Sequence, residues 1–216
     1  MRSSIIVFDL DGTLVDSAAG IRQAFHLTLD EWGREASDDV LGTLIGPPLH
    51  DSFARLGFLP DEIDDVVARY RQHYDVVGPP GCRPYPGVEG LLTRAASVAP
   101  IALASAKRED FARRILAEWA LSDHFVAIVG APHDGRRVDK SALLETALQR
   151  AGLVAPTGWM VGDRRFDVEA GRHVGLRTLG VLWGYGTRGE LVDAGVDALA
   201  ASPSEAADRL VAAFAR

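Results

Sequence analysis

Five short apolar segments, separated by stretches of helical spacing, constrain the fold of this chain more than any other feature. Each has five or six residues and is bounded by Gly, Asp, Ser or Pro. The segments are 4–9, 100–105, 125–130, 158–163 and 177–181. Strands that are apolar on both faces are typical of a parallel sheet covered by helices on both sides. We therefore predict an α/β fold with a doubly wound, parallel, Rossmann-like sheet.

Helical patterns fill most of the intervals between these strands, because apolar residues recur there at three- and four-residue spacing. These segments are 88–98, 108–119, 141–151 and 166–174. Strands that alternate with helices favour βαβ units, and βαβ units build parallel sheets.

The long interval between residues 9 and 100 breaks this alternation, because it contains no convincing strand. We expect four helices there, at 17–32 with Ser17 as N-cap, 38–44, 48–56 and 60–77. The Gly-Pro-Pro-Gly run at 78–81 closes the interval. An insert of this length beside an active site is usually a lid. We therefore predict a helical cap domain at 17–80 and an α/β hydrolase core at 1–16 and 81–216.

The charge balance and the cysteine content limit the partners and the location that we expect. The 216 residues include 23 Lys and Arg and 30 Asp and Glu, giving a net charge of −7. This argues against a nucleic-acid polymer or a membrane surface as partner. The one cysteine, Cys82, cannot form an intramolecular disulfide. No stretch approaches the roughly 18 apolar residues of a membrane span, and no signal peptide is recognisable. We predict a cytoplasmic protein; the sequence carries no sign of its oligomeric state.

Polar residues lie where the predicted strands end, which is the edge that binds ligands in open α/β sheets. The side chains that we expect to meet there are Asp9, Asp11, Ser105, Lys140, Asp163 and Asp167. Several carboxylates in one cleft are unfavourable unless some are protonated or a cation binds them. A metal accounts for several acids at once, and oxygen ligands suit Mg²⁺. The sequence therefore predicts a magnesium site.

Two common nucleotide- and metal-binding motifs are excluded by spacing. An EF-hand loop that began at Asp9 would need a glycine at its sixth position, whereas Gly12 stands at the fourth. The glycine-rich run of a P-loop does not follow any predicted strand. The Gly184-Tyr185-Gly186 triplet alone is typical of a turn.

Four separate motifs resemble the signatures of the haloacid dehalogenase-like hydrolases. The first is Asp9-Leu10-Asp11-Gly12-Thr13, and Ser105, Lys140 and the run 162–167 stand for the other three, in the family's order and spacing. The inserted helices are similar to the small helical cap of this family. The segments 45–49, 85–88 and 180–191 resemble its phosphoglycolate phosphatase-like and 5′-nucleotidase-like branch.

The resemblance implies a role for each motif residue. Asp9 would be the nucleophile that forms an aspartyl-phosphate, and Asp11 would be the general acid and base. The Mg²⁺ ligands would be the Asp9 carboxylate, the Asp11 main-chain carbonyl, Asp163 and, through a water molecule, Asp167. The phosphate would be bound by Gly12, Thr13, Ser105, Ala106 and Lys140. The second motif departs from the common Thr-Ser-Lys, because here it reads Ala104-Ser105-Ala106-Lys107. Lys107 could reach the substrate or remain solvated.

The same resemblance separates the possible reactions. Dehalogenases of this family lack the second aspartate, whereas Asp11 is present here. Phosphonate-cleaving members need a lysine in the cap, and residues 17–79 contain none. We therefore predict a Mg²⁺-dependent phosphatase of small phosphorylated metabolites. A 5′-nucleoside monophosphate is the first candidate substrate, and phosphoglycolate or a sugar phosphate is the alternative.

Two other readings stay open. A hexose phosphomutase would keep the same core residues. A receiver-type phospho-acceptor module also has an α/β fold with clustered aspartates, but it lacks a helical insert after the first strand. The cap residues that we expect near a substrate are Arg22, the 46–48 turn, Arg69, Arg71 and His73. We interpret Trp32, Phe53 and Tyr70 as the packed core of the cap. Asp16 lies at the expected hinge, where we predict a structural hydrogen bond.

Overall fold

The chain divides into two compact units. The computed structural model describes residues 4–133, 139–153 and 157–215. The core unit comprises 1–15 and 84–216, and the helical unit comprises 16–83. Among the described residues, no helix combines the length and the apolar character needed to cross a membrane.

The core unit contains a six-stranded sheet in which every strand pairs parallel with its neighbours. The strand order is β5-β4-β1-β6-β7-β8. The strands are β1 (Ser4–Phe8), β4 (Ile101–Arg108), β5 (Phe125–Ala131), β6 (Thr157–Gly162), β7 (Arg177–Val181) and β8 (Ala198–Ala200). The predicted doubly wound α/β fold is confirmed, and all five predicted strands are present. The edge strand β8 and the two helices at Arg188–Asp193 and Pro203–Phe214 were not predicted.

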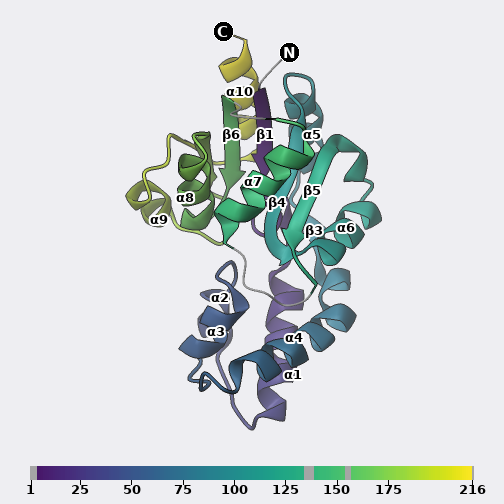
Figure 1. Ribbon diagram of the computed structural model, residues 1–216, viewed down its shortest axis with the longest axis vertical. Coiled ribbons are helices and arrows are strands. Elements are labelled where there is room, and N and C mark those ends of the chain that lie inside the picture. Colours follow the sequence, from purple (N-terminus) through teal and green to yellow (C-terminus); the bar gives the residue numbers. More distant parts are fainter. Residues whose placement is uncertain (1–3, 134–138, 154–156, 216) are drawn as a thin grey trace. The chain divides into compact units, whose positions relative to one another are not determined.

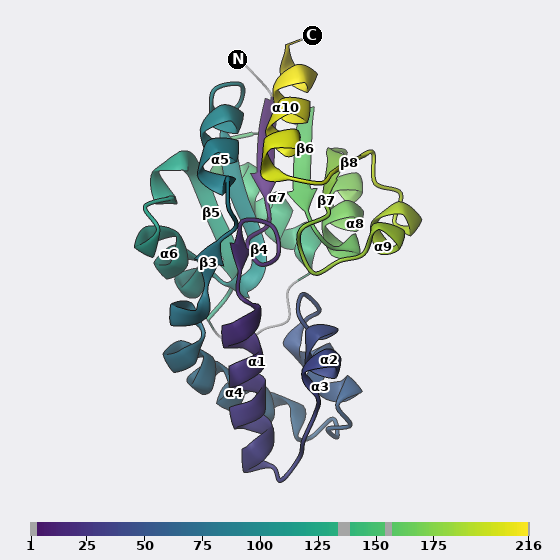
Figure 2. The ribbon, with the colours of Figure 1, turned by 180° about the vertical axis from the view of Figure 1, so that it is seen from behind.

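Helices cover both faces of this sheet. On the face toward the viewer in Figure 1 lie α7 (Lys140–Arg150) and α8 (Arg165–His173). The view from behind in Figure 2 shows α5 (Val88–Ala96) and α10 (Pro203–Phe214) on the other face. Helix α6 (Glu109–Glu118) packs on β4 and β5, and the short α9 (Arg188–Asp193) follows β7.

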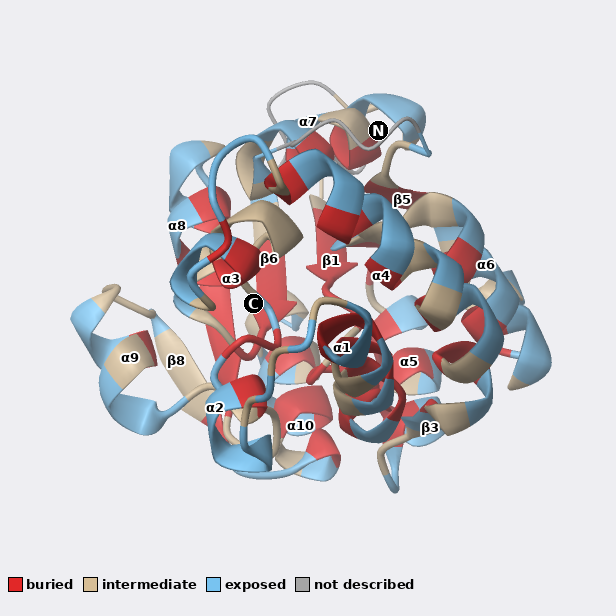
Figure 3. Cartoon of the chain, turned by 90° about the horizontal axis from the view of Figure 1, so that it is seen from below, coloured by how far each residue is buried: buried red, intermediate tan, exposed pale blue. Residues whose placement is uncertain are grey.

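Alternation along the central strand explains why both faces need a helical cover. In β1, Ile5 and Val7 point to the cluster built with α7, which includes Leu144 and Met160. Successive side chains of a strand point to opposite faces, and the intervening Ile6 is also fully buried. Figure 3 shows β1 and most of β6 buried, whereas the helices alternate buried and exposed residues. The sheet is therefore buried on both faces, and polar residues such as Asp9 follow where its strands end.

The helical unit consists of α1 (Ala18–Glu31), α2 (Asp38–Gly42), α3 (Leu49–Arg55) and α4 (Ile63–Val77), followed by the 3₁₀ turn η1 (Pro79–Gly81). Its core is aromatic: the ring of Phe25 lies 5.2 Å from that of Phe53 and 4.7 Å from that of Tyr70. The prediction that Phe53 and Tyr70 form packed core is confirmed by their burial.

The start of α1 differs in one detail from the prediction. Ser17 occupies the N-cap position, but its side chain makes no capping hydrogen bond. The Ala18 N–H donates instead to the Asp16 carboxylate at 3.0 Å. The structural hydrogen bond predicted for Asp16 is thus confirmed. The N-cap position predicted for Ser17 is also confirmed, although the side chain of Ser17 does not supply the capping bond. The chain leaves and re-enters the core unit through β2 (Val15–Asp16) and β3 (Arg83–Pro84), which pair in a separate two-stranded sheet.

A matched pair of valines in β5 tests the packing of the sheet. Val129 is 1% exposed within the α7 cluster, whereas Val126 is 57% exposed. Val129→Ala should lower the free energy of unfolding by about 2 kcal/mol, because two buried methyl groups are lost and a cavity remains. Val126→Ala should change it by less than about 0.5 kcal/mol. Urea unfolding followed by circular dichroism measures both, and equal effects would contradict this packing.

Candidate active site

Asp9 stands at the end of the central strand and is held by a lysine. Its carboxylate is buried, and the Nζ atom of Lys140 lies 2.6 Å from its Oδ1 atom. Lys140 is the first residue of α7, whose N-cap Asp139 accepts a hydrogen bond from the Ser141 N–H. The start of α7 thereby places an ammonium group beside the end of β1.

Lys140 also binds a second carboxylate. Its Nζ atom lies 2.9 Å from Oδ1 of Asp167, which belongs to α8. Burial would lower the pKa of Lys140, but the carboxylates of Asp167 and Asp9 outweigh burial and raise this pKa above its usual value. Lys140 therefore stays charged and joins the ends of two elements.

Asp163 follows β6 and accepts hydrogen bonds from two other loops. The Tyr185 N–H donates to its Oδ2 atom at 2.7 Å, and the hydroxyl of Thr13 donates to its Oδ1 atom at 3.3 Å. Asp167 is buried too, and its Oδ2 atom accepts from the Arg164 N–H at 3.1 Å. This last bond is the helix-start role that any aspartate could have there. The contact with Lys140 goes beyond that role.

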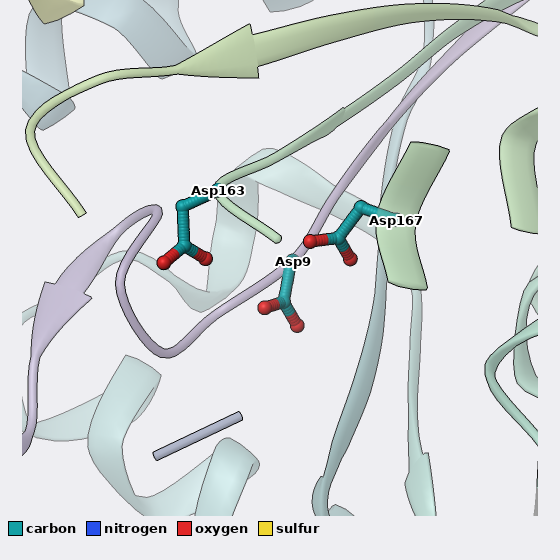
Figure 4. Close-up of side chains that lie close together, drawn as sticks. All are labelled: Asp9, Asp163 and Asp167. Carbon is teal, nitrogen blue, oxygen red and sulfur yellow. The ribbon is translucent and has the colours of Figure 1, made fainter. Parts of the chain in front are cut away.

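Asp9, Asp163 and Asp167 form one cluster, shown in Figure 4. One carboxylate oxygen of each lies within 4.8 Å of the others. Burial, and then the neighbouring carboxylates of Asp167 and Asp9, raise the pKa of Asp163 to about 8. Burial raises the pKa of Asp9 to about 6, although Lys140 opposes the shift. The cluster is thus unfavourable when fully ionised.

The donor set fits Mg²⁺. Three hard oxygen donors converge, and they are of the kind that Mg²⁺ prefers. A divalent cation would offset the repulsion among these carboxylates, which adds to burial in raising the pKa of Asp163. The cluster consists of side-chain oxygens and does not include Asp11. The contact of the Asp11 main-chain carbonyl with the metal therefore stays a prediction.

Asp11 is paired with Lys107, for which the sequence allowed either a contact with the substrate or a solvated position. The Nζ atom of Lys107 lies 2.8 Å from Oδ2 of Asp11, and the lysine side chain is only 5% exposed. The solvated alternative for Lys107 is therefore wrong. The Oδ1 atom of Asp11 is buried and has no hydrogen-bond partner among the described residues. Asp9 and Asp11 thus each face a different lysine.

Ser105 and Ala106 lie in the last part of β4, beside the end of β1. Ser105 is buried, and its Oγ atom accepts from the Lys107 N–H at 3.3 Å. Ala106 is exposed. The phosphate-binding role of both residues stays a prediction.

Gly12 and Thr13 build the turn after Asp11. Gly12 has a φ of +81°, a conformation that glycine adopts without strain. Its N–H donates to the Val15 carbonyl at 2.9 Å, and the Thr13 N–H donates to the Leu10 carbonyl at 3.3 Å. The two N–H groups serve the turn in this structure, and their contact with phosphate stays a prediction.

Sequence reasoning missed the contribution of the segment after β7. Trp183 donates from its indole Nε1–H to the Thr13 carbonyl at 3.0 Å, and the N–H groups of Tyr185 and Gly186 reach Asp163. The Gly-Tyr-Gly triplet was interpreted as a plain turn. Its closely spaced glycines were the signal for a close approach of the backbone.

Two of the cap residues that we expected near a substrate have a partner within the helical unit. Arg69 and His73 both pair with Glu31, at 2.8 and 2.9 Å. A role of these residues, of Arg22 or of the 46–48 turn toward a substrate stays a prediction.

Residues 6–181 match the family model of the haloacid dehalogenase-like hydrolases, so the chain belongs to this family. The family resemblance seen in the motifs is confirmed. The protein is 34% identical over 194 residues to a 5′-nucleotidase of Pseudomonas aeruginosa, and the alignment covers 88% of each chain. It is 33% identical to a phosphoglycolate phosphatase of Aquifex aeolicus, over 84% of this chain and 85% of that protein.

The chain is also similar to a protein whose name describes another activity. It is 36% identical over 192 residues to the tyrosine-protein kinase PtkA of Mycobacterium tuberculosis. The alignment covers 88% of this chain but 65% of PtkA, so the chain spans less than two thirds of that relative.

Solved structures of hydrolases share the fold over nearly the whole chain. A haloacid dehalogenase-like hydrolase from Streptococcus pneumoniae has a TM-score of 0.88 at 31% identity, with 100% of both chains covered. A predicted phosphatase from Clostridium acetobutylicum has a TM-score of 0.92 at 28% identity, covering 98% of this chain and 100% of that one.

The raised pKa of Asp163 predicts how stability depends on pH. Between pH 6 and 8 the folded, metal-free chain holds a proton on Asp163 that the unfolded chain, with a pKa near 3.8, has released. The free energy of unfolding should therefore fall as the pH rises through this window, by at most about 1.4 kcal/mol per unit from this group. Urea unfolding at several pH values in chelator measures the slope.

Asp163→Asn should make this slope shallower, because asparagine does not titrate. In the wild type, added Mg²⁺ should raise the melting temperature more at pH 8 than at pH 6, since the cation binds the ionised cluster. An equal pH slope in wild type and variant would contradict the assignment of the titration to Asp163.

Proposed function

We propose that this protein is a Mg²⁺-dependent phosphatase that hydrolyses a small phosphomonoester through an aspartyl-phosphate on Asp9. The observation that carries the proposal is the pairing at the end of β1. Asp9 meets Lys140, Asp11 meets Lys107, and two further buried carboxylates stand beside Asp9. A nucleophile, an acid–base group and positive charges next to them are what phosphoryl transfer requires.

In the first step, a carboxylate oxygen of Asp9 attacks phosphorus. The bond from phosphorus to the leaving oxygen breaks, and Asp11 gives its proton to that oxygen. An alcohol leaves, and a phosphoryl group remains on Asp9. The two residues at i and i+2 can share this work because both follow the same strand end. The buried Oδ1 atom of Asp11 has no hydrogen-bond partner among the residues that the structure describes, and it is available to a substrate or a water molecule.

In the second step, water attacks the same phosphorus. Asp11, now deprotonated, takes a proton from this water, and the bond between phosphorus and the Asp9 oxygen breaks. Inorganic phosphate leaves, and both aspartates return to their starting state. Lys140 lies beside the reacting carboxylate throughout and can neutralise charge on the phosphoryl oxygens.

Asp9, Asp163 and Asp167 would hold the Mg²⁺ ion, with the Asp11 carbonyl as a further ligand. When bound, the ion supplies charge neutralisation for the phosphoryl group. Lys140 would keep Asp9 and Asp167 apart and oriented, because it contacts both. Ser105 and Ala106, at the end of the neighbouring strand, would contribute phosphate contacts.

The names of the relatives support a small phosphorylated metabolite as substrate. One relative is named 5′-nucleotidase and is matched over 88% of its length. This favours a 5′-nucleoside monophosphate as first candidate. A second relative, named phosphoglycolate phosphatase, supports the alternative of phosphoglycolate or a sugar phosphate. We also propose a cytoplasmic location.

Two rival functions make distinct predictions. A hexose phosphomutase would return a phosphorylated sugar in place of free phosphate. A receiver-type module would keep a long-lived aspartyl-phosphate without turnover, and the four helices inserted after β1 count against it.

A phosphate-release screen tests the proposal. Nucleoside monophosphates, sugar phosphates and phosphoglycolate should be assayed with Mg²⁺ and with chelator, and turnover should require Mg²⁺. Asp9→Asn should lower turnover by at least about a thousandfold, because the nucleophile is lost. Asp11→Asn should lower it by about a hundredfold or more, because proton transfer is lost.

Asp208→Asn is the matched control, since this aspartate is 65% exposed on α10 and pairs with Arg94. It should turn over as the wild type does. Undiminished activity in chelator or in Asp9→Asn would rule out the mechanism. Transfer to a sugar without release of free phosphate would favour the mutase.

A further inference from the structure

The segment Trp183–Gly186, which we name the 183–186 segment, lies against two loops of the candidate site. It follows β7 and precedes α9. At its start, the indole of Trp183 donates to the Thr13 carbonyl at 3.0 Å. At its end, the N–H of Tyr185 donates to Asp163 at 2.7 Å. One segment thus contacts both the turn after Asp11 and a carboxylate of the cluster.

The two contacted loops are also joined to each other. Thr13 donates from its hydroxyl to Oδ1 of Asp163, while the N–H groups of Tyr185 and Gly186 point to Oδ2, at 2.7 and 3.4 Å. Both oxygens of the carboxylate are therefore oriented by donors outside its own strand. Donors of this kind determine which lone pairs remain for a cation.

The glycines of the segment are required because neighbouring backbone atoms lie close to them, and not because of their own backbone angles. Neither Gly184 nor Gly186 is among the described glycines with positive φ. A Cβ atom at Gly184 would overlap the Gly12 carbonyl oxygen, and one at Gly186 would overlap the Asp163 carbonyl oxygen. An ordinary turn would tolerate alanine at such angles. Here the neighbouring site forbids it.

The chain directly after the segment is fixed to the helix that carries Asp167. Glu190 of α9 accepts from the Arg164 side chain at 2.9 Å and from the Arg165 N–H at 3.0 Å, at the start of α8. Thr187, directly after the segment, accepts from the Glu190 N–H. The segment therefore cannot shift freely away from the cluster.

We propose that the 183–186 segment is a positioning element that sets the orientation of Asp163 for the cation and ties it to the turn after the nucleophile. This inference rests on the proposed Mg²⁺ site. Its shorter hydrogen bonds come from the indole N–H of Trp183 and the backbone N–H of Tyr185. None of these groups touches the reacting atoms, so their effect passes through Thr13 and Asp163.

Binding of Mg²⁺ alone, without substrate, tests this inference. Isothermal titration calorimetry should compare the wild type with Trp183→Phe, which keeps an aromatic ring but removes the N–H donor. We expect Mg²⁺ binding to weaken by about tenfold, the scale found when a partner of a metal ligand is lost. Excess Mg²⁺ should restore part of the lost phosphatase turnover.

Trp119→Phe is the matched control. Trp119 is the C-cap of α6, which follows β4 and therefore ends at the opposite edge of the sheet. The same chemical change there should leave the affinity for Mg²⁺ within twofold of the wild type.

A pair of glycine variants gives a second, independent test. Gly184→Ala introduces the overlap with Gly12 and should weaken Mg²⁺ binding by about tenfold or more. Gly189→Ala adds the same methyl group in the first turn of α9, where its nearest neighbour lies 3.9 Å away, and should bind Mg²⁺ normally. Melting temperatures in chelator report whether each variant is folded.

The outcomes separate this inference from the proposed function. A wild type that does not bind Mg²⁺ overturns the metal site and, with it, the positioning role. A wild type that binds Mg²⁺, with Trp183→Phe and Gly184→Ala within twofold of it, overturns the positioning role alone. If both variants are unfolded in chelator while both controls are folded, the segment is a requirement for folding, and the positioning role is also overturned.

Discussion

The repulsion among buried carboxylates at one edge of the sheet is the constraint on which the rest of the site depends. Four aspartates stand at the ends of β1 and β6 or just beyond, and two lysines oppose them: Lys140 between Asp9 and Asp167, and Lys107 beside Asp11. Among the described residues, neither lysine pairs with Asp163, and burial together with the carboxylates of Asp167 and Asp9 raises its pKa to about 8, above the value of about 6 for Asp9. Two negative charges remain unmatched when all four ionise, the charge that a divalent cation carries.

The sheet could be predicted because burial on both faces leaves a strong signal. Strands such as 4–8 are uniformly apolar, and each helix between them has an apolar stripe. Helix α10 has an apolar stripe but was not predicted, whereas two smaller elements carried no such signal. The edge strand β8 has only the residues Ala-Leu-Ala, and α9 has six residues, too few for a helical period to be distinguished. These two elements follow β7 at the rim of the sheet, where fewer residues need burial.

The site could be predicted only as far as its side chains carry chemistry. Aspartate and lysine at strand ends are visible in a sequence, and their meeting point follows from the topology. Backbone donors are invisible, because every residue except proline has an N–H group. The donors to Asp163 from Tyr185 and Gly186 are of this kind. Lys107 was ambiguous for another reason: its burial depends on Asp11, a residue 96 positions away in the chain.

Close packing of the backbone connects the charged side chains with the backbone donors that orient them. A carboxylate cluster can be buried only if donors approach from several loops, and loops approach so closely only where side chains are absent. Gly12, Gly162, Gly184 and Gly186 all lie where a Cβ atom would overlap Asp163 or Asp167, or the turn beside them. The acids supply the charge, and the glycines supply the space in which the backbone can hold that charge in place. A chain with the four aspartates but with bulkier loops would have the ligands without the geometry.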